Sequence, residues 1–187
     1  MADDAEQSPD EARASRQGLG LLIGPYTGTG VACAVAATVA DQASKLWLLF
    51  AFDLQSRGLV KVAPFLDLVL VWNYGISYGL FQQSSEFGRW VLLAIKGAAV
   101  VLLWVWLARA QSRLTAISLG LIIGGALGNA ADRLAYGAVA DFVLFHITTA
   151  HWSFNWYVFN LADVAIVAGV AGLLYESVLG VRAAKLP

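Results

Sequence analysis

The sequence predicts a membrane protein built as one bundle of four transmembrane helices with a small sheet at its surface. Hydrophobic residues make up 59% of the chain and charged residues only 13%, whereas a soluble domain carries roughly 25% charged residues. Asp132, Asp141 and Asp163 nevertheless lie within or beside apolar segments, each next to a polar neighbour. Because an ionisable group at membrane depth is costly, this grouping suggests chemistry on a substrate that itself lies in the membrane.

Four apolar segments, taken in order, are each long enough to approach the about 30 Å of a bilayer's hydrocarbon as a helix. Residues 18–40 contain no charged side chain, and the later segments run from about Trp90 to Leu107, from about Leu114 to Asp132 and from about Phe159 to Leu179. Lys96 lies inside the second segment and has no obvious partner in the sequence.

The four helices are expected to form one domain over residues 18–180. Residues 1–17 are polar and rich in acid, which predicts a disordered tail and argues against a signal peptide with a basic start. Residues 181–187 form a second short tail. The net charge of −1 excludes a strongly basic nucleic-acid binder, and the single cysteine, Cys33, excludes an internal disulfide.

Basic residues predict the orientation of the bundle. Arg109 and Arg113 lie in the short link between the second and third segments, and both tails also carry basic residues, whereas residues 134–158 contain no Lys or Arg. The positive-inside rule therefore puts both termini in the cytoplasm.

Two segments are then expected on the outer side. Residues 53–88 include the β-rich run from Phe65 to Trp72, which predicts a small sheet or hairpin on the membrane surface. Residues 135–157 are rich in aromatic residues and are expected to be interfacial. His146 and His151 lack a third ligand at metal spacing, so they are interpreted as part of this interfacial segment.

Small residues are expected to let the third helix pack closely against its neighbours. Gly120, Gly124 and Gly128 recur every four residues, so they line one side of that helix. Such a ridge of small residues is typical of packed membrane helices.

Polar pairs on the first and third helices reach the same outer depth. Asp41 and Lys45 are four residues apart and can pair on one helix face. Two alternatives stay open: the pair is structural, or Lys45 meets a lipid headgroup or orients the site. Asn129, Asp132 and Arg133 share a face of the third helix. Asp132 and Arg133 are expected either to pair and hold the helix end or to take part in acid–base chemistry.

Asp141 and Asp163 are the candidates for catalysis. Asp141 sits among apolar residues, where desolvation should raise its pKa. If it lies near Asp163, one carboxyl would be protonated and the other ionised, which is how aspartic proteases activate water. Asn160, three residues before Asp163, is explained equally well as a helix cap, but a cap does not explain Asp163 itself.

These residues resemble the lipoprotein signal peptidase (signal peptidase II) family, the intramembrane aspartic peptidases of bacteria. The resemblance covers about residues 30 to 180 and rests on five motifs in order: Asp41-Gln-Ala-Ser-Lys45, Asn73-Tyr-Gly-Ile-Ser-Tyr-Gly79, Gly124-Gly-Ala-Leu-Gly-Asn129-Ala-Ala-Asp132-Arg133, Val139-Ala-Asp141-Phe142 and Phe159-Asn160-Leu-Ala-Asp163. Lys96 and the long segment between Asp141 and Asp163 depart from the family pattern.

The resemblance implies an all-α membrane bundle of four transmembrane helices, a small extracytoplasmic β-cradle and an interfacial periplasmic-side helix, in the bacterial inner membrane with the active site near the outer face. It implies that Asp141 and Asp163 form the catalytic dyad, without a metal or cofactor. The remaining motif residues would bind substrate or support the site: Asp41, Lys45, Asn73, Gly75, Asn129, Asp132, Arg133 and Asn160.

The substrates implied are prolipoproteins whose cysteine carries a diacylglyceryl group, cleaved on the N-terminal side of that cysteine. Membrane lipids and family inhibitors such as globomycin are the other expected partners, and the chain is expected to be a monomer. Two alternatives stay open: a proton-coupled transporter, which also uses buried carboxylates, and a non-catalytic lipid-binding scaffold. The acids at one interface and the lack of an inverted repeat argue against a transporter.

Overall fold

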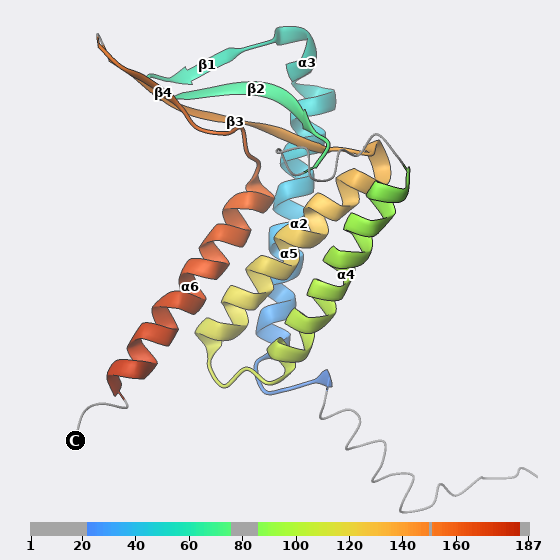
Figure 1. The fold of residues 1–187 in the computed structure, drawn as a ribbon, viewed down its shortest axis with the longest axis vertical. Coiled ribbons are helices and arrows are strands. Elements are labelled where there is room, and N and C mark those ends of the chain that lie inside the picture. Colours follow the sequence, from blue (N-terminus) through green and yellow to red (C-terminus); the bar gives the residue numbers. More distant parts are fainter. Residues whose placement is uncertain (1–21, 76–85, 150, 184–187) are drawn as a thin grey trace, which may run out of the picture.

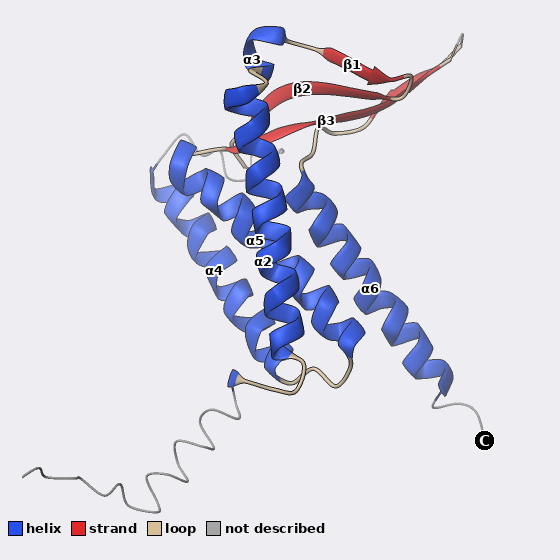
Figure 2. Ribbon diagram, turned by 180° about the vertical axis from the view of Figure 1, so that it is seen from behind, coloured by secondary structure: helices blue, strands red, loops and turns tan. Residues whose placement is uncertain are grey.

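Four long helices stand side by side with a four-stranded antiparallel sheet across one end (Figures 1 and 2). This computed structural model describes residues 22–75, 86–149 and 151–183. The helices are α2 (Thr27–Leu46), α4 (Glu86–Ala108), α5 (Arg113–Tyr136) and α6 (Leu161–Ala183). The predicted tail of residues 1–17, residues 184–187 and the second half of the Asn73–Gly79 motif lie outside the described residues.

The first helix includes the Asp41–Lys45 pair, as the expected pairing on one helix face requires. Helix α2 begins at Thr27, runs to Leu46 and continues as a π-helical turn over Trp47–Ala51. Asp41 and Lys45 lie 2.7 Å apart inside the bundle. A one-turn helix, α3 (Leu54–Arg57), follows and leads into the sheet.

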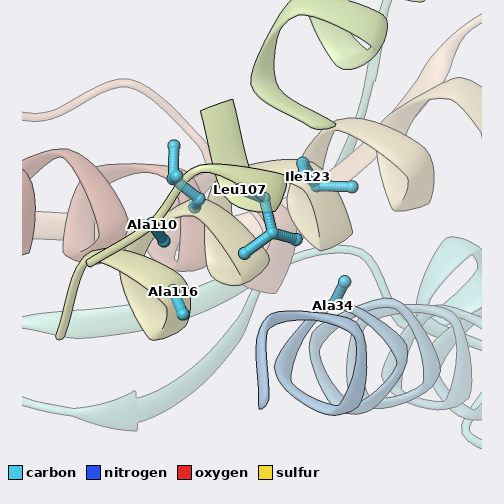
Figure 3. Packing of buried hydrophobic residues seen from close by; sticks show 6 residues of the cluster. Ala34, Leu107, Ala110, Ala116 and Ile123 are labelled. Atoms are coloured by element: carbon cyan, nitrogen blue, oxygen red, sulfur yellow. The ribbon is translucent and has the colours of Figure 1, made fainter. Parts of the chain in front are cut away.

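Helix α5 lies at the centre and packs closely against α2 through the predicted glycine ridge. A Cβ atom on Gly120 would lie 2.3 Å from the carbonyl oxygen of Gly30, and one on Gly124 would lie 2.4 Å from that of Ala34. The backbones therefore approach at distances that only glycine allows. Beside this seam, Ala34, Leu107, Ala116, Leu119 and Ile123 form a buried apolar cluster between α2, α4 and α5 (Figure 3).

The ends of α5 are fixed locally. Ser112 caps the first turn, because its Oγ accepts the backbone N–H of Thr115 at 3.0 Å. Gly137 follows the last turn with φ of 76°, the left-handed conformation that commonly ends a helix. The chain then turns directly into the sheet at Val139.

Among the described helices, α5 and the Leu161–Val178 part of α6 are long and apolar enough to cross a membrane, and Gly97–Ala108 of α4 is a shorter apolar stretch. Large apolar side chains on the outside of the bundle are exposed, as in Leu102 at 71% and Val167 at 68%. Four membrane-crossing helices therefore stay a prediction, of which two have the required length and hydropathy here.

The sheet has the order β1 (Val60–Ala63), β2 (Leu66–Asn73), β3 (Val139–Thr148) and β4 (Ser153–Asn155). The expected strands within residues 53–88 are present. Residues 135–157 were expected to be interfacial, and no strand was assigned to them, but Val139–Thr148 is a strand that pairs with β2 over most of its length. Its β-branched and aromatic residues favour a strand once such a partner is available.

Side-chain alternation along β3 gives the sheet two different faces. Leu68 pairs with Val143 and Val71 with Asp141, so the register between β2 and β3 shifts at this point. The backbone N–H groups of Phe142 and Val143 both donate to the oxygen of Phe159, at 3.1 and 2.8 Å, so β3 is irregular there as well. Beyond this irregularity, Phe145 and Ile147 share one face. Ile147 lies opposite Phe154, whose ring contacts those of Trp152 and Trp156 at centroid distances of 5.7 and 5.8 Å. This face thus becomes aromatic toward the tip of the sheet.

The opposite face of the sheet carries a polar pair. His146 Nε2 lies 3.1 Å from Asp67 Oδ2, and both residues point away from the face of Phe145 and Ile147 by strand alternation. This contact could not be expected from the sequence, since it depends on the register between β2 and β3.

Candidate active site

Asp141 lies where the sheet meets the ends of the helices, and both of its carboxylate oxygens accept hydrogen bonds. Its residue is 2% exposed. Asn73, at the end of β2, donates from Nδ2 to Oδ2 at 3.0 Å, and Asn160 donates from Nδ2 to Oδ1 at 2.6 Å. Asn160 reaches Asp141 because the preceding residue, Phe159, bonds to Val143 of β3 through both backbone groups, at 2.8 and 3.0 Å.

Asp163 lies in the first turn of α6 and is also bonded through both oxygens. Asn129 Nδ2 donates to Oδ1 at 3.0 Å, and the backbone N–H of Asn160 donates to Oδ2 at 3.2 Å. In return, Asn160 Oδ1 accepts the backbone N–H of Asp163 at 3.0 Å. This is a reciprocal capping box, so the expectation that capping would not explain Asp163 is wrong: Asp163 closes the cap with one oxygen and presents the other to Asn129.

Asn160 joins the two carboxyl groups. Its side chain donates to Asp141, its backbone donates to Asp163, and its residue is 1% exposed. The same Nδ2 also donates to Asn129 Oδ1 at 3.0 Å. The two aspartates that the sequence singled out are therefore brought together through one amide.

Three asparagines present their NH₂ groups to the aspartates, because another donor occupies each carbonyl oxygen. Asn73 Oδ1 accepts the backbone N–H of Gly75 at 3.1 Å. Asn160 Oδ1 accepts that of Asp163, and Asn129 Oδ1 accepts Lys45 Nζ at 3.2 Å. Gly75 has φ of 148°, which favours glycine, so its residue type fits its supporting position.

The pKa of Asp141 is raised from 3.8 to about 6. Burial is the largest cause, the hydrogen bond from Asn73 opposes it, and the negative charge of Asp163 adds to it; Asn160 and Lys45 act in the lowering direction. A carboxyl with such a pKa can hold a proton close to neutral pH. The raised pKa agrees with the expectation from the apolar sequence around Asp141.

A buried ion cluster lies behind the two aspartates. Lys45 Nζ is 2.7 Å from Asp41 Oδ2 and 2.8 Å from Asp132 Oδ2. The expected pairing of Asp132 with Arg133 is therefore wrong, because Asp132 faces Lys45 on another helix. Lys45 is 2% exposed, so a lipid headgroup does not reach it.

Arg133 is nearly buried and incompletely bonded. Its Nη1 donates to the backbone oxygen of Asn129 at 3.2 Å, and its Nε has no hydrogen-bond partner within residues 22–75, 86–149 and 151–183. The charges of Asp141 and Asp163 act on this guanidinium. A buried unsatisfied donor beside two carboxyl groups is suited to hold a carbonyl oxygen of a bound peptide.

Gln42 is the supporting residue that the sequence analysis missed. Its Nε2 donates to Asp132 Oδ1 at 2.8 Å and to the backbone oxygen of Gly128 at 3.0 Å. The available signal was its place inside the Asp41–Lys45 motif, next to a residue already singled out.

Known proteins resemble this chain over the whole site. The sequence model of the family described as signal peptidase (SPase) II matches residues 33–179. A protein of Nitrobacter hamburgensis named lipoprotein signal peptidase is 66% identical over 159 residues, covering 85% of this chain and 97% of that protein. A protein of the same name from Rhodopseudomonas palustris (strain TIE-1) is 56% identical, covering 84% and 96%.

The fold resembles that of a solved structure titled as a bacterial membrane enzyme. The TM-score is 0.63 with 24% identity, covering 85% of this chain and 92% of the other. At this identity, the likeness concerns the fold alone.

Proposed function

This chain belongs to the signal peptidase II family, and from that premise we propose that it is an intramembrane aspartic endopeptidase. It removes signal peptides from diacylglyceryl-modified prolipoproteins and cuts on the N-terminal side of the lipidated cysteine. The observation that carries the proposal is the pairing of Asp141 and Asp163 through Asn160. The negative charge of Asp163 also raises the pKa of Asp141, so one carboxyl can be protonated while the other is ionised, as the chemistry of aspartic peptidases requires.

In the proposed mechanism, the ionised carboxylate removes a proton from water while the protonated carboxyl donates to the oxygen of the scissile carbonyl. As the tetrahedral intermediate collapses, the carboxyl that took the proton from water passes it to the leaving amine, and the other carboxylate recovers its proton from a hydroxyl of the intermediate. Asp141 is the preferred proton donor, because burial raises its pKa to about 6. Asp163 is the preferred base, because it accepts two N–H bonds at a helix N-terminus, where a carboxylate is stabilised.

The substrate would lie along the junction of sheet and helices. Arg133 would hold a peptide carbonyl through its unsatisfied Nε, and the acyl chains would stay in lipid beside the exposed apolar sides of the helices. We place the site at the outer face of the bacterial inner membrane, with four membrane helices and both termini in the cytoplasm. The protein would act as a monomer, without a metal or cofactor, and bind globomycin.

The position of the carboxyl groups speaks against a proton-coupled transporter. Asp141 is on the sheet and Asp163 is in the first turn of α6, so both lie at one end of the bundle. A transporter would be expected to place such groups near the midplane between repeats.

The test is cleavage of a diacylglyceryl-modified prolipoprotein peptide by the purified full chain in detergent. The wild type should cut before the modified cysteine, and Asp141→Asn and Asp163→Asn should each lose activity while staying folded. Glu176→Gln is the matched control, since Glu176 links α6 to Ser112 and Thr115 at the other end of the bundle. An inactive wild type would refute the proposed activity, and an active Asp141→Asn would refute the dyad.

A further inference from the structure

The two carboxylates of the buried ion cluster each bind one particular backbone amide. Asp41 Oδ1 accepts the N–H of Ala162 at 2.9 Å, and Asp132 Oδ2 accepts the N–H of Ala140 at 3.1 Å. Ala162 immediately precedes Asp163, and Ala140 immediately precedes Asp141. Each member of the proposed dyad therefore follows a residue whose backbone is held by a carboxylate from another element.

These two backbone N–H groups depend on the carboxylates for their hydrogen bonds. Ala162 lies in the first turn of α6, where backbone N–H groups have no partner inside the helix. Ala140 and Ala162 are both 0% exposed, so water cannot replace the bond. An unpaired buried amide costs about 1–3 kcal/mol, which favours the observed positions of both carboxylates.

The carboxylates are themselves held tightly. Lys45 Nζ bridges Asp41 and Asp132, and it also donates to Asn129, whose NH₂ group faces Asp163. Gln42 donates to the second oxygen of Asp132 at 2.8 Å. These bonds leave neither carboxylate free to rotate away from its amide.

We propose that Asp41 and Asp132 are positioning residues, each of which fixes one dyad carboxyl by holding the backbone N–H of the residue before it, with Lys45 locking the two together. The inference rests on the dyad proposed above. Neither residue touches the substrate or exchanges a proton with it. Their effect is on geometry, and a displacement of about 1 Å at a reacting group can cost about 100-fold in rate.

The competing explanation is a structural one, in which the cluster merely holds α2 and α5 together. The two explanations differ in where a substitution is expected to have its effect. Positioning predicts that Asp132 controls the backbone at Asp141 and that Asp41 controls the backbone at Asp163. A structural role predicts loss of stability throughout the bundle, without a selective effect on either amide.

The test uses the full chain in detergent with Asp41→Asn and Asp132→Asn. Asp41 uses separate oxygens for Lys45 and the Ala162 amide, so an asparagine there can satisfy only one of them. Asp132 accepts Lys45 and the Ala140 amide through Oδ2 and Gln42 through Oδ1, so an asparagine there must turn its NH₂ group toward one set of these donors. We expect kcat per folded molecule to fall by about 10- to 100-fold, with KM changed less than about twofold because substrate contacts are untouched. Hydrogen–deuterium exchange should rise at Ala140 only in Asp132→Asn and at Ala162 only in Asp41→Asn.

Two further variants allow the inference to be tested even if the asparagine variants do not fold. If the asparagine variants do not fold, Gln42→Leu removes one donor to Asp132 without changing any charge, and it should lower kcat and raise exchange at Ala140. Glu176→Gln, an interhelical contact far from the site, should leave kcat unchanged. Wild-type kcat in the folded variants, or exchange that rises equally at both amides, would overturn the inference.

The failure of this inference is distinguishable from failure of the dyad. If Asp141→Asn remains active, the dyad is wrong whatever the positioning variants do. If Asp141→Asn is inactive and exchanges normally at both alanines while Asp41→Asn and Asp132→Asn keep full kcat, the dyad stands and only the positioning role is refuted.

Discussion

Replacing the buried Asp141 by asparagine should remove activity and at the same time stabilise the fold. A carboxyl whose pKa is raised from 3.8 to about 6 binds its proton more tightly in the folded than in the unfolded chain. The contribution of this proton to the free energy of unfolding is therefore complete below about pH 4 and is lost as the pH rises through about 6. Asparagine does not titrate, so the free energy of unfolding of the variant does not fall with pH in this way.

The size of the effect follows from the pKa. The rise from 3.8 to about 6 corresponds to about 3 kcal/mol of lost stability at neutral pH, at 1.36 kcal/mol per pH unit. Asn73 and Asn160 both donate to Asp141, and an asparagine there can accept only one of these bonds, which costs about 1 kcal/mol or more. The net gain at pH 7.5 should therefore be about 1–2 kcal/mol, or about 3–6 °C in Tm for a chain of this size.

The assay is thermal unfolding of the two proteins in detergent at pH 4 and at pH 7.5. Asp141→Asn should melt higher than the wild type at pH 7.5, and this advantage should disappear at pH 4. Asp53→Asn, which removes an exposed carboxylate, is the matched control for the loss of one negative charge. A variant that is less stable than the wild type at pH 7.5, or a difference that is independent of pH, would refute the reasoning.

Three other substitutions test the packing and hydrogen bonds of the site. Asn160→Ser keeps a capping side chain but loses the amide that lowers the pKa of Asp141, so the alkaline limb of the kcat/KM profile should move to higher pH; an unshifted limb would contradict this role. Gly124→Ala puts a Cβ 2.4 Å from a backbone oxygen of α2 and should lower the free energy of unfolding by about 1–3 kcal/mol. In the control, Gly97→Ala, the added Cβ meets nothing within 4 Å, so the free energy of unfolding should not fall. Gly75→Ala strains a residue with φ of 148° and should lower kcat more than it lowers Tm; equal kcat in the two proteins would show that the turn does not support the site.

Contacts within one helix could be predicted from the sequence, because helical spacing fixes them. Asp41 and Lys45, four residues apart, pair as expected. The glycines of α5 form the expected close seam. The candidate site residues were identified from the five motifs and their order in the chain. They were expected to lie close together because each motif was placed near the same end of the bundle.

Contacts between elements could not be predicted in the same way. Asp132 was expected either to pair with Arg133 or to take part in acid–base chemistry. Its ion-pair partner is Lys45, at 2.8 Å, because the choice depends on how α2 rotates against α5. The strand over Val139–Thr148 was missed, since aromatic and β-branched residues suit both an interface and a sheet, and only pairing with β2 decides between them.

The bonds between β3 and the residue before Asn160 make the site sensitive to the length of that strand. Asp141 is followed by Phe142 and Val143, whose backbone N–H groups both donate to the oxygen of Phe159. Inserting or deleting one residue between Asp141 and Val143 would turn the carboxyl group to the other face relative to this anchor. Length variation among related chains should therefore occur in the β3–β4 turn and not between Asp141 and Val143.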